Sequence, residues 1–380
     1  MNIGQAGLRV AILNPCYWPE VRRGSERFLT DLADGLIARG HAPRLITSHR
    51  GWPKRSVQGG LTIVRHWRPP QGRLRRRGFP TYVAHAPLSY LSLLAGNDDV
   101  AHALYPIDAL AGARWSERTG RPSIYSAMGL PTRSWLVGSR YLSQATMRAA
   151  TANTAFVVLS RAAAEAYERL TGLAARVIHP GVDLDAFAPG GERAQAPTFM
   201  CAASVEEPRK RVGLLLEAFQ SVRRQRPDAR LVLSRPRDLT AVRDLGDTPG
   251  VVLEDLDDRT ALADAYRRAW VSVLPSYAEA FGLVLVEALA CGTPVVGTAA
   301  GAIPEVIDRP EIGRRFDDAD QPAASLAEAL LEALELAEEP GTAAACRARA
   351  ADFSLERCVT AYEALYRSLV QGSDEAPRRA

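Results

Sequence analysis

The stretch Leu274-Pro-Ser-Tyr-Ala-Glu-Ala-Phe-Gly-Leu-Val-Leu-Val-Glu287 links a predicted strand to a predicted helix. The apolar run from Val271 to Leu274 predicts a buried strand, and a loop with proline and serine follows it. A mostly apolar segment from about Phe281 through Glu287 predicts the helix. Strand, loop and helix in this order form the unit from which open α/β sheets are built, so the stretch predicts an α/β fold.

The start of this helix has the properties of an anion-binding site. The first amides of a helix have no acceptor within it, and the helix dipole places partial positive charge at that end. Ala280 and Gly282 are small, so the backbone around them is open to a ligand. We therefore expect a diphosphate to bind here, against the backbone of Ala280, Phe281, Gly282 and Leu283.

Two carboxylates flank the turn, Glu279 before the helix and Glu287 within it. Eight helical steps span about 12 Å, whereas the paired acids of a retaining glycosidase lie about 5 Å apart. We therefore predict separate roles: Glu279 binds hydroxyls of a donor sugar, and Glu287 binds ribose hydroxyls. The alternative is that Glu279 is only a favourable charge near a helix start and Glu287 a surface residue. The helix is apolar almost all round, however, so Glu287 is expected to need a partner.

The alternation of strand and helix runs along the chain in two rounds. Leu8 to Leu13 predicts a strand, a helix follows and ends at Arg39-Gly40-His41, and Arg44 to Thr47 predicts the next strand. After Asp183 the sequence becomes rich in proline and glycine, and the alternation then restarts. We expect two α/β domains with a parallel sheet each, over residues 1–187 and 188–352, then a helix over 353–370 and a disordered tail over 371–380.

The composition is that of an ordinary soluble protein. Of 380 residues, 47% are hydrophobic and 24% are charged. No apolar run reaches the roughly 18–20 residues of a membrane-spanning helix, and Met1 to Gly7 lacks the features of a signal peptide. The five cysteines are scattered without a Cys-x-x-Cys pair, which predicts a reduced compartment and no structural metal. We therefore expect a cytoplasmic protein.

Charge is distributed unevenly between the two halves. Residues 1–185 carry 24 basic and 12 acidic side chains, whereas the remainder carries 23 basic and 31 acidic ones. A basic first half indicates an anionic partner: a membrane surface, a phosphorylated acceptor or a nucleic acid. The local cluster comprises Arg73 and Arg75 to Arg77, beside Trp67 and Phe79; a solvated loop is the alternative interpretation. Only two basic residues are lysines, Lys54 and Lys210, which favours a specific role for a compact ammonium group.

The run from Glu279 to Glu287, followed by Ala290-Cys-Gly-Thr-Pro-Val-Val296, resembles the donor-site signature of the retaining GT-B glycosyltransferases of family four. The resemblance extends over nearly the whole chain, through Pro15 to Glu26, Ile178 to Asp183, Lys210 to Phe219 and Gly301 to Glu305. It implies two Rossmann-like domains that face each other across a cleft, with the donor mainly on the second and the acceptor mainly on the first.

The resemblance also implies an activity. The protein would be a bacterial hexosyltransferase that moves a sugar from a nucleotide diphosphate sugar to an acceptor hydroxyl with retention, without a metal or other cofactor. Lys210, with Arg209, would neutralise the leaving diphosphate, and Gly24 and Ser25 would approach it from the first domain. The leaving phosphate would accept the acceptor's proton. The basic first domain implies an anionic or lipid-linked acceptor and contact with the inner face of the membrane.

Two positions depart from the family pattern. Met128, before Gly129, stands where the family commonly has histidine, and a thioether can neither donate a hydrogen bond nor carry a proton. Val205 stands where an arginine is expected, and Arg209 is a candidate substitute. His102 joins Met128 and Gly129 as an acceptor-side candidate, although a lone histidine beside a strand is often structural.

Three other functions compete with this prediction. Because of these departures, a nucleotide-sugar-binding protein whose catalysis is lost or only regulatory is the alternative. A Rossmann dehydrogenase is disfavoured, because the first loop lacks Gly-x-Gly-x-x-Gly and no acidic residue ends the second strand. Nucleic-acid binding would rest on the arginine cluster alone, without a recognisable module, so no nucleic-acid partner is expected.

Overall fold

The computed structural model describes residues 7–18, 20, 24–70, 72, 81–138, 140–236, 245 and 248–372. The chain divides into two compact units, Met1–Gly181 with Leu355–Ala380, and Val182–Ser354. The first division lies six residues before the expected boundary, and Asp183 belongs to the second unit, where it pairs with Arg259 at 3.2 Å. The predicted disordered tail lies outside the described residues from 373 onward.

The N-terminal unit contains an eight-stranded sheet with the order β3-β4-β2-β1-β5-β6-β7-β8. Its central strands are buried along almost their whole length, as expected of a parallel sheet that is covered on both faces. The strands are β1 (Arg9–Leu13), β2 (Ala42–His49), β3 (Lys54–Gln58), β4 (Leu61–Trp67), β5 (Val100–Ala103), β6 (Ser123–Ala127), β7 (Ala155–Val158) and β8 (Arg176–Val177).

One strand corrects the expectation of a wholly parallel sheet. β3 pairs with β4 in the antiparallel direction, through a turn at Gly59 and Gly60, whose φ angles are 54° and 90°. Glycine adopts such angles without steric cost, which suits a tight hairpin. Lys54 to Gln58 contains a single hydrophobic residue, so hydrophobic patterning does not reveal this edge strand.

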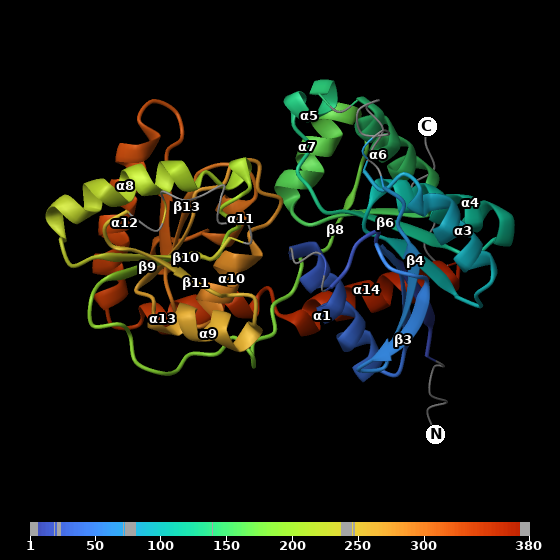
Figure 1. The fold of residues 1–380 in the computed structure, drawn as a ribbon, viewed down its shortest axis with the longest axis horizontal. Helices are drawn as coiled ribbons and strands as arrows, with labels where there is room; N and C mark the ends of the chain where they lie inside the picture. The colour runs from blue at the N-terminus through green and yellow to red at the C-terminus, as the bar shows by residue number, and fades with distance from the viewer. Residues whose placement is uncertain are drawn as a thin grey trace. The chain divides into compact units, whose positions relative to one another are not determined.

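Helices cover both faces of this sheet (Figure 1). α1 and α14 pack on one face, and α3, α4 and α6 pack on the other. Because α14 follows the second unit in sequence, the chain returns to the first unit at its end. The helices are α1 (Gly24–Ala38), α3 (His85–Leu94), α4 (Pro106–Thr119), α5 (Arg133–Gly138), α6 (Arg140–Ala152), α7 (Arg161–Thr171) and α14 (Leu355–Val370).

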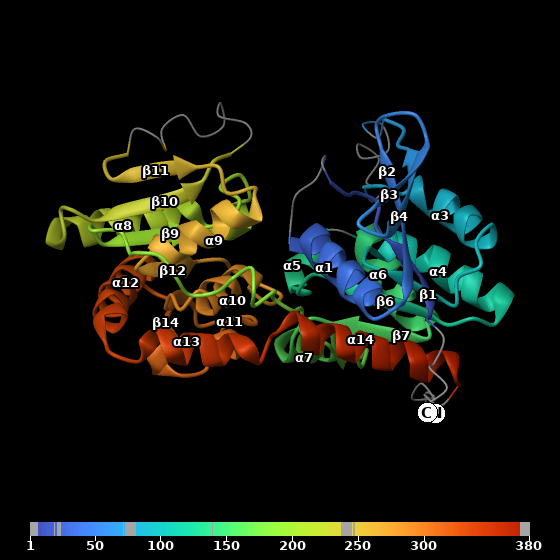
Figure 2. The same ribbon diagram turned by 90° about the horizontal axis from the view of Figure 1, so that it is seen from below.

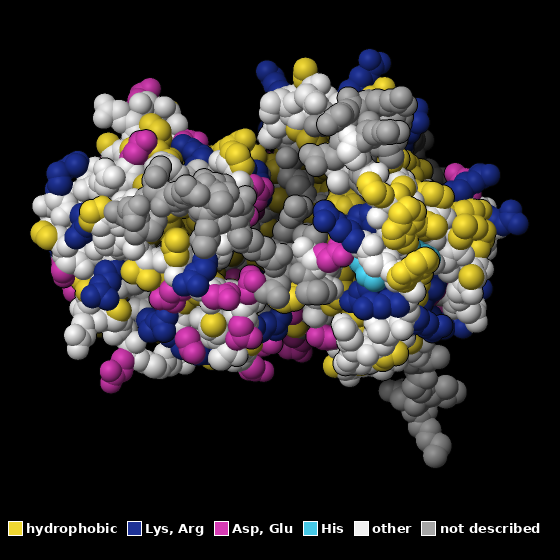
Figure 3. Space-filling view, viewed as in Figure 1, with side chains coloured by type: hydrophobic (Ala, Val, Ile, Leu, Met, Phe, Trp, Pro, Cys, Tyr) yellow, Lys and Arg dark blue, Asp and Glu magenta, His cyan; other side chains and the backbone are white. Residues whose placement is uncertain are grey.

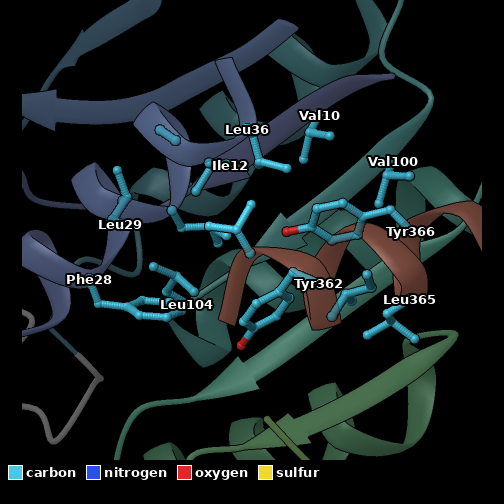
Figure 4. Close-up of a cluster of buried hydrophobic side chains, with 14 of the residues drawn as sticks. Val10, Ile12, Phe28, Leu29, Leu36, Val100, Leu104, Tyr362, Leu365 and Tyr366 are labelled. Atoms are coloured by element: carbon cyan, nitrogen blue, oxygen red, sulfur yellow. The ribbon is translucent and has the colours of Figure 1, made fainter. Parts of the chain in front are cut away.

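Helix α14 is an integral part of the N-terminal core. Figure 4 shows Tyr362 and Tyr366 of α14 among apolar side chains of α1 and the sheet, including Phe28. A β-carbon on Gly35 of α1 would lie 2.4 Å from Cγ2 of Val359. The two helices therefore approach more closely than a larger residue at position 35 would permit.

An ion-pair cluster holds the outer side of α14. Arg39 donates to Oε2 of Glu363 at 2.9 Å. Nε2 of His41 and the Arg367 guanidinium both lie near its Oε1, at 3.1 and 2.9 Å. Because Nδ1 of His41 accepts a hydrogen bond from the Leu8 amide at 3.0 Å, Nε2 carries the proton that points at Glu363. Burial favours a higher pKa for Glu363, but these donors outweigh it and lower the pKa to about 2.

The second unit contains a parallel six-stranded sheet with the order β11-β10-β9-β12-β13-β14. Figure 2 shows β11, β10, β9 and β12 as successive neighbours. α8 and α12 pack together on one face, and α9, α10 and α13 lie on the other. The strands are β9 (Thr198–Cys201), β10 (Arg230–Ser234), β11 (Val251–Glu254), β12 (Val271–Leu274), β13 (Val295–Thr298) and β14 (Gly313–Phe316); the helices are α8 (Val212–Gln225), α9 (Arg259–Arg268), α10 (Leu283–Ala290), α11 (Ile303–Val306), α12 (Pro322–Glu338) and α13 (Thr342–Ala351).

Candidate functional site

The predicted anion-binding turn lies between β12 and α10, at the carboxyl end of the sheet where open α/β folds bind ligands. α10 begins at Leu283, two residues later than predicted, because Gly282 has a φ of 98° and forms the N-cap. The amides of Leu285 and Val286 bond to the Gly282 carbonyl at 2.9 and 3.5 Å. The backbone amides that precede Leu285 are the ones that a helix start directs at an external acceptor.

The side chains of this turn face inward. Phe281 is buried and packs edge-on against Phe353, with ring centroids 5.2 Å apart, and Ala280 is buried as well. Leu283 is half-buried. A ligand at this turn would therefore meet backbone rather than these side chains. A β-carbon on Gly282 would lie 3.0 Å from Cδ1 of Ile303, so glycine suits both the space and the angle at this position.

Glu279, Lys210 and Arg209 come together although almost seventy residues separate the two segments. The Lys210 ammonium lies 2.8 Å from Oε2 of Glu279, and the Arg209 guanidinium lies 3.1 Å from the same oxygen. Lys210 ends a 3₁₀ turn, Pro208–Lys210, that follows β9. The Tyr277 amide donates to the Arg209 carbonyl at 3.2 Å, which joins the two loops through the backbone.

The electrostatics keep this carboxylate ionised. Burial favours a higher pKa for Glu279, but Lys210 and Arg209 outweigh it and hold the pKa below its ordinary value. Both ion pairs use Oε2, and within the described part of the chain no bond to Oε1 is found. Glu279 can therefore accept a hydrogen bond from a ligand hydroxyl through Oε1 while Oε2 orients the two cations.

Further contacts fix the position of Glu279. Its carbonyl accepts from the Ala302 amide at 3.1 Å, which brings the segment from Gly301 to Glu305 beside it. Arg209 also pairs with Glu207 at 3.0 Å. Arg211 follows Lys210 in the left-handed conformation, with a φ of 54°, and its side chain pairs with Asp318. The pair with Asp318 helps to hold Arg211, the residue after Lys210, in this strained conformation.

Glu287 lies in a different environment. Its side chain is only 2% exposed, so the surface-residue interpretation is wrong, and Tyr266 of α9 donates to its Oε2 at 3.1 Å. The expected partner is therefore a tyrosine. The estimate of eight helical steps from Glu279 does not hold, because α10 covers only the second half of that interval. The two carboxylates nevertheless have separate partners, and ribose binding by Glu287 stays a prediction.

Gly24 and Ser25 lie in the N-terminal unit, at the start of α1. Ser25 Oγ donates to Glu26 at 3.1 Å. Glu26 is buried. It also accepts hydrogen bonds from the side-chain amide of Asn14 at 3.3 Å and from the Cys16 thiol at 3.2 Å. Hydrophobic patterning alone does not reveal this buried acid. Its signal is a carboxylate in the first helical turn, directly after Gly-Ser and following a buried strand.

The structure corrects the assignment of His102. This residue has no exposed surface; Nδ1 lies 2.8 Å from the Tyr366 hydroxyl and Nε2 lies 2.7 Å from Ser126 Oγ. Burial lowers its pKa to about 3, so the ring is neutral. His102 therefore belongs to the core beneath α14. Of the other acceptor-side candidates, Met128 packs partly against the same core, whereas Gly129 is exposed with open space beside it.

Other predictions lie outside the site or outside the described residues. The cluster of Arg73 and Arg75 to Arg77 falls in the undescribed segment 73–80. Within the described ranges, no three His, Cys, Asp or Glu side chains gather as a metal-binding group. The described helices include none with the length and apolarity to cross a membrane.

Comparison with known families covers most of the chain. A model of "Glycosyltransferase Family 4" matches residues 22–186, and a model of "Glycosyl transferases group 1" matches residues 196–336. A D-inositol 3-phosphate glycosyltransferase from Mycobacterium sp. (strain JLS) is 36% identical over 162 residues, which are 38% of this chain and 36% of the relative. The match thus spans about a third of that relative's length.

Solved structures match over nearly the whole length. Sucrose-phosphate synthase from Thermosynechococcus elongatus has a TM-score of 0.76 at 21% identity, covering 96% of this chain and 100% of the other. Anabaena HepE in complex with UDP-glucose has a TM-score of 0.69 at 17% identity, covering 95% and 100%. At these identities the likeness concerns the fold, which is the predicted GT-B class with two Rossmann-like units.

Proposed function

Because this chain belongs to the glycosyltransferases of group 1 and family four, we propose that it moves a sugar from a nucleotide diphosphate sugar to an acceptor hydroxyl. The observation that carries the proposal is the cluster in which Glu279 holds Lys210 and Arg209 beside the start of α10. This arrangement combines fixed cations, a helix start and a carboxylate with an available oxygen.

Each part of the cluster has a distinct task in the proposed donor complex. Lys210 and Arg209 stabilise the diphosphate, together with amides of the turn from Ala280 to Leu283. Oε1 of Glu279 accepts from hydroxyls of the donor sugar, for which we propose a hexose. Glu287 binds the ribose, with Tyr266 setting the orientation of its carboxylate. Gly24 and Ser25 are the proposed contact from the N-terminal unit.

The proposed reaction needs no separate base on the protein to take the acceptor's proton. The bond between the anomeric carbon and the diphosphate oxygen breaks, and a bond from the acceptor oxygen to that carbon forms. The acceptor's proton passes to the leaving phosphate, so the products are a glycoside and a nucleoside diphosphate. We propose retention at the anomeric carbon. Lys210 and Arg209 would supply the positive charge that other transferases take from a divalent ion, which makes the reaction metal-independent.

The acceptor is proposed to be anionic. The basic first half of the sequence supports this, and the mycobacterial relative is named for an inositol phosphate. Met128 and Gly129 follow β6 at the carboxyl edge of the N-terminal sheet, and we keep them as acceptor-side candidates. A lipid-linked acceptor at the inner face of the membrane fits the same charge, and the protein would then be a cytoplasmic, peripheral one.

The test is the release of nucleoside diphosphate from UDP-, GDP- and ADP-sugars in the presence and absence of acceptors. Inositol phosphates and anionic lipid extracts serve as acceptors, each with and without EDTA. Release that depends on an acceptor and persists in EDTA supports the proposal. Tight donor binding without turnover would favour a nucleotide-sugar-binding protein without catalysis. Absence of both binding and turnover would overturn the proposed function.

A further inference from the structure

Two tryptophans lie exposed at the edge of the N-terminal sheet. Trp52 is 90% exposed and Trp67 is 50% exposed, next to the exposed basic residues Arg50 and Lys54. We call these four residues the tryptophan edge. Figure 3 shows hydrophobic side chains gathered on the N-terminal unit, with Lys and Arg side chains beside them. Tryptophan is seldom left so fully in water without a partner.

Strand pairing brings the two tryptophans to one place. Lys54, the first residue of β3, pairs with Arg65 in the antiparallel β3–β4 ladder, and Trp67 follows two residues later at the end of β4. His49 pairs with Trp67 across β2 and β4, and its Nε2 lies 2.7 Å from the Trp52 carbonyl. Paired residues point to the same face of a sheet and every second residue of a strand does too, so Lys54 and Trp67 share one face; the backbone of Trp52 lies beside them through His49.

The charge around the tryptophan edge is mainly basic, with one carboxylate, Glu20, which accepts from the Arg50 backbone amide at 3.0 Å. The sequence from Arg50 to Arg68 contains five basic residues and no acidic one. Arg68 pairs with Glu20, and Arg65 bonds to Ser56 and lies over the Tyr17 ring. Within the described ranges, no carboxylate pairs with the three exposed cations, which are Arg50, Lys54 and Arg55. Exposed cations beside exposed indole rings suit a partner that is both anionic and apolar.

We propose that the tryptophan edge docks on the surface of an anionic lipid bilayer; this rests on the proposed lipid-linked acceptor. Indole rings partition into the headgroup region, where their N–H group stays hydrated, and basic side chains are attracted to acidic headgroups. The edge lies at the carboxyl ends of β2 and β4, the side of an open α/β sheet where ligands bind. Docking would bring headgroups to that side of the unit.

A second copy of the chain fits this edge less well. β3 is an edge strand, and pairing with another β3 would extend the sheet. In parallel in-register pairing, Lys54 and Arg55 would lie beside the same cations of the second copy, and like charges on neighbouring strands repel each other. Basic residues on edge strands are a common protection against such pairing.

The experiment is co-sedimentation of the full chain with vesicles of neutral phosphatidylcholine, with and without 30 mol% phosphatidylglycerol. We expect binding to the anionic vesicles only, with a blue shift of tryptophan fluorescence and release as NaCl rises from 0.1 to 0.5 M. Trp52→Ser with Trp67→Ser should weaken binding at least about tenfold. Arg50→Ala with Lys54→Ala should weaken it about 25-fold, at roughly fivefold per cation.

A matched control removes other exposed apolar side chains of the same unit. Val137 and Tyr141 are 84% and 51% exposed on α5 and α6, and Val137→Ser with Tyr141→Ser should bind vesicles like the wild type. Equal loss in this control, or full binding by the double tryptophan variant, would overturn the proposal. The proposal would also be overturned if sedimentation showed that the wild type is a dimer and that the double variant Trp52→Ser with Trp67→Ser is a monomer.

The outcome is separable from that of the proposed function. Thermal unfolding of each variant first establishes that it is folded, and the shift on adding a nucleotide sugar reports the donor site, which lies in the other unit. Vesicle binding by a protein without transferase activity would refute the proposed function and leave the docking surface intact. Transferase activity on a soluble acceptor without vesicle binding would refute the docking surface alone.

Discussion

Replacing Lys210 by alanine removes the ammonium group that lies 2.8 Å from Glu279. In the proposed reaction, negative charge develops on the leaving diphosphate, and this ammonium is already positioned to meet it. Removal of one fixed donor from a site of developing charge slows catalysis about 10²- to 10³-fold, or about 2.7–4 kcal/mol of transition-state stabilisation. We expect kcat to fall by that factor in Lys210→Ala.

The effect on donor binding should be smaller. The diphosphate already carries charge in the ground state, so the donor KM should rise about fivefold to tenfold. Lys210→Arg keeps the charge but replaces a compact ammonium by a planar guanidinium, so we expect it to recover only part of kcat. Arg209 remains in both variants and holds Glu279 at 3.1 Å, which limits the loss.

The assay is acceptor-dependent release of nucleoside diphosphate under initial-rate conditions. Arg268→Ala is the matched control, since Arg268 also pairs with a glutamate at 2.8 Å, Glu254, in the same unit. The control should keep the wild-type kcat. A Lys210→Ala enzyme whose kcat stays within threefold of the wild type, while the protein remains folded, would refute the assigned role of this cation.

Three further variants test other parts of the structure. Glu279→Gln keeps the shape but loses the carboxylate charge, so kcat/KM should fall at least about tenfold, whereas Glu254→Gln should leave steady-state rates unchanged. The pKa of Glu363 is about 2 against an ordinary 4.5, so its stabilisation is present above pH 4.5 and is lost as pH falls toward 2. Glu363→Gln should therefore lower the free energy of unfolding by about 1–2 kcal/mol at pH 7 and flatten its decline in acid, which urea titrations from pH 7 to 3 measure; an unchanged acid profile contradicts this. Gly35→Ala should destabilise by about 1–3 kcal/mol, although alanine usually stabilises helices, and Val359→Ala in addition should recover part of the melting temperature; a stabilised single variant contradicts the close packing.

Local patterns predicted much of the second unit. The strand from Val271 to Leu274 and the helix after it follow from apolar runs and from glycine at position 282. The need of Glu287 for a partner followed from its apolar helix. The identity of that partner, Tyr266, depends on the packing of α9 against α10, which no local pattern determines.

The sequence predicted the N-terminal unit less completely. His102 follows a strand start in the sequence, but its burial depends on Tyr366 of a helix that is more than 260 positions away. β3 has too few apolar residues to show a period of two, and its pairing is set by the Gly59-Gly60 turn. Hydrophobic patterning detects elements that are buried on a face, so an exposed edge strand escapes it.

The most direct test of the donor site is a thermal-shift screen of UDP-, GDP- and ADP-sugars. At a ligand concentration of about 100 times Kd, binding adds about 2.7 kcal/mol to the stability of the native state, which corresponds to a rise of several degrees in Tm. We predict that nucleotide sugars of one base class raise the Tm of the wild type and raise it less in Lys210→Ala. No shift with any of them at millimolar concentration would contradict a nucleotide-sugar site at the start of α10.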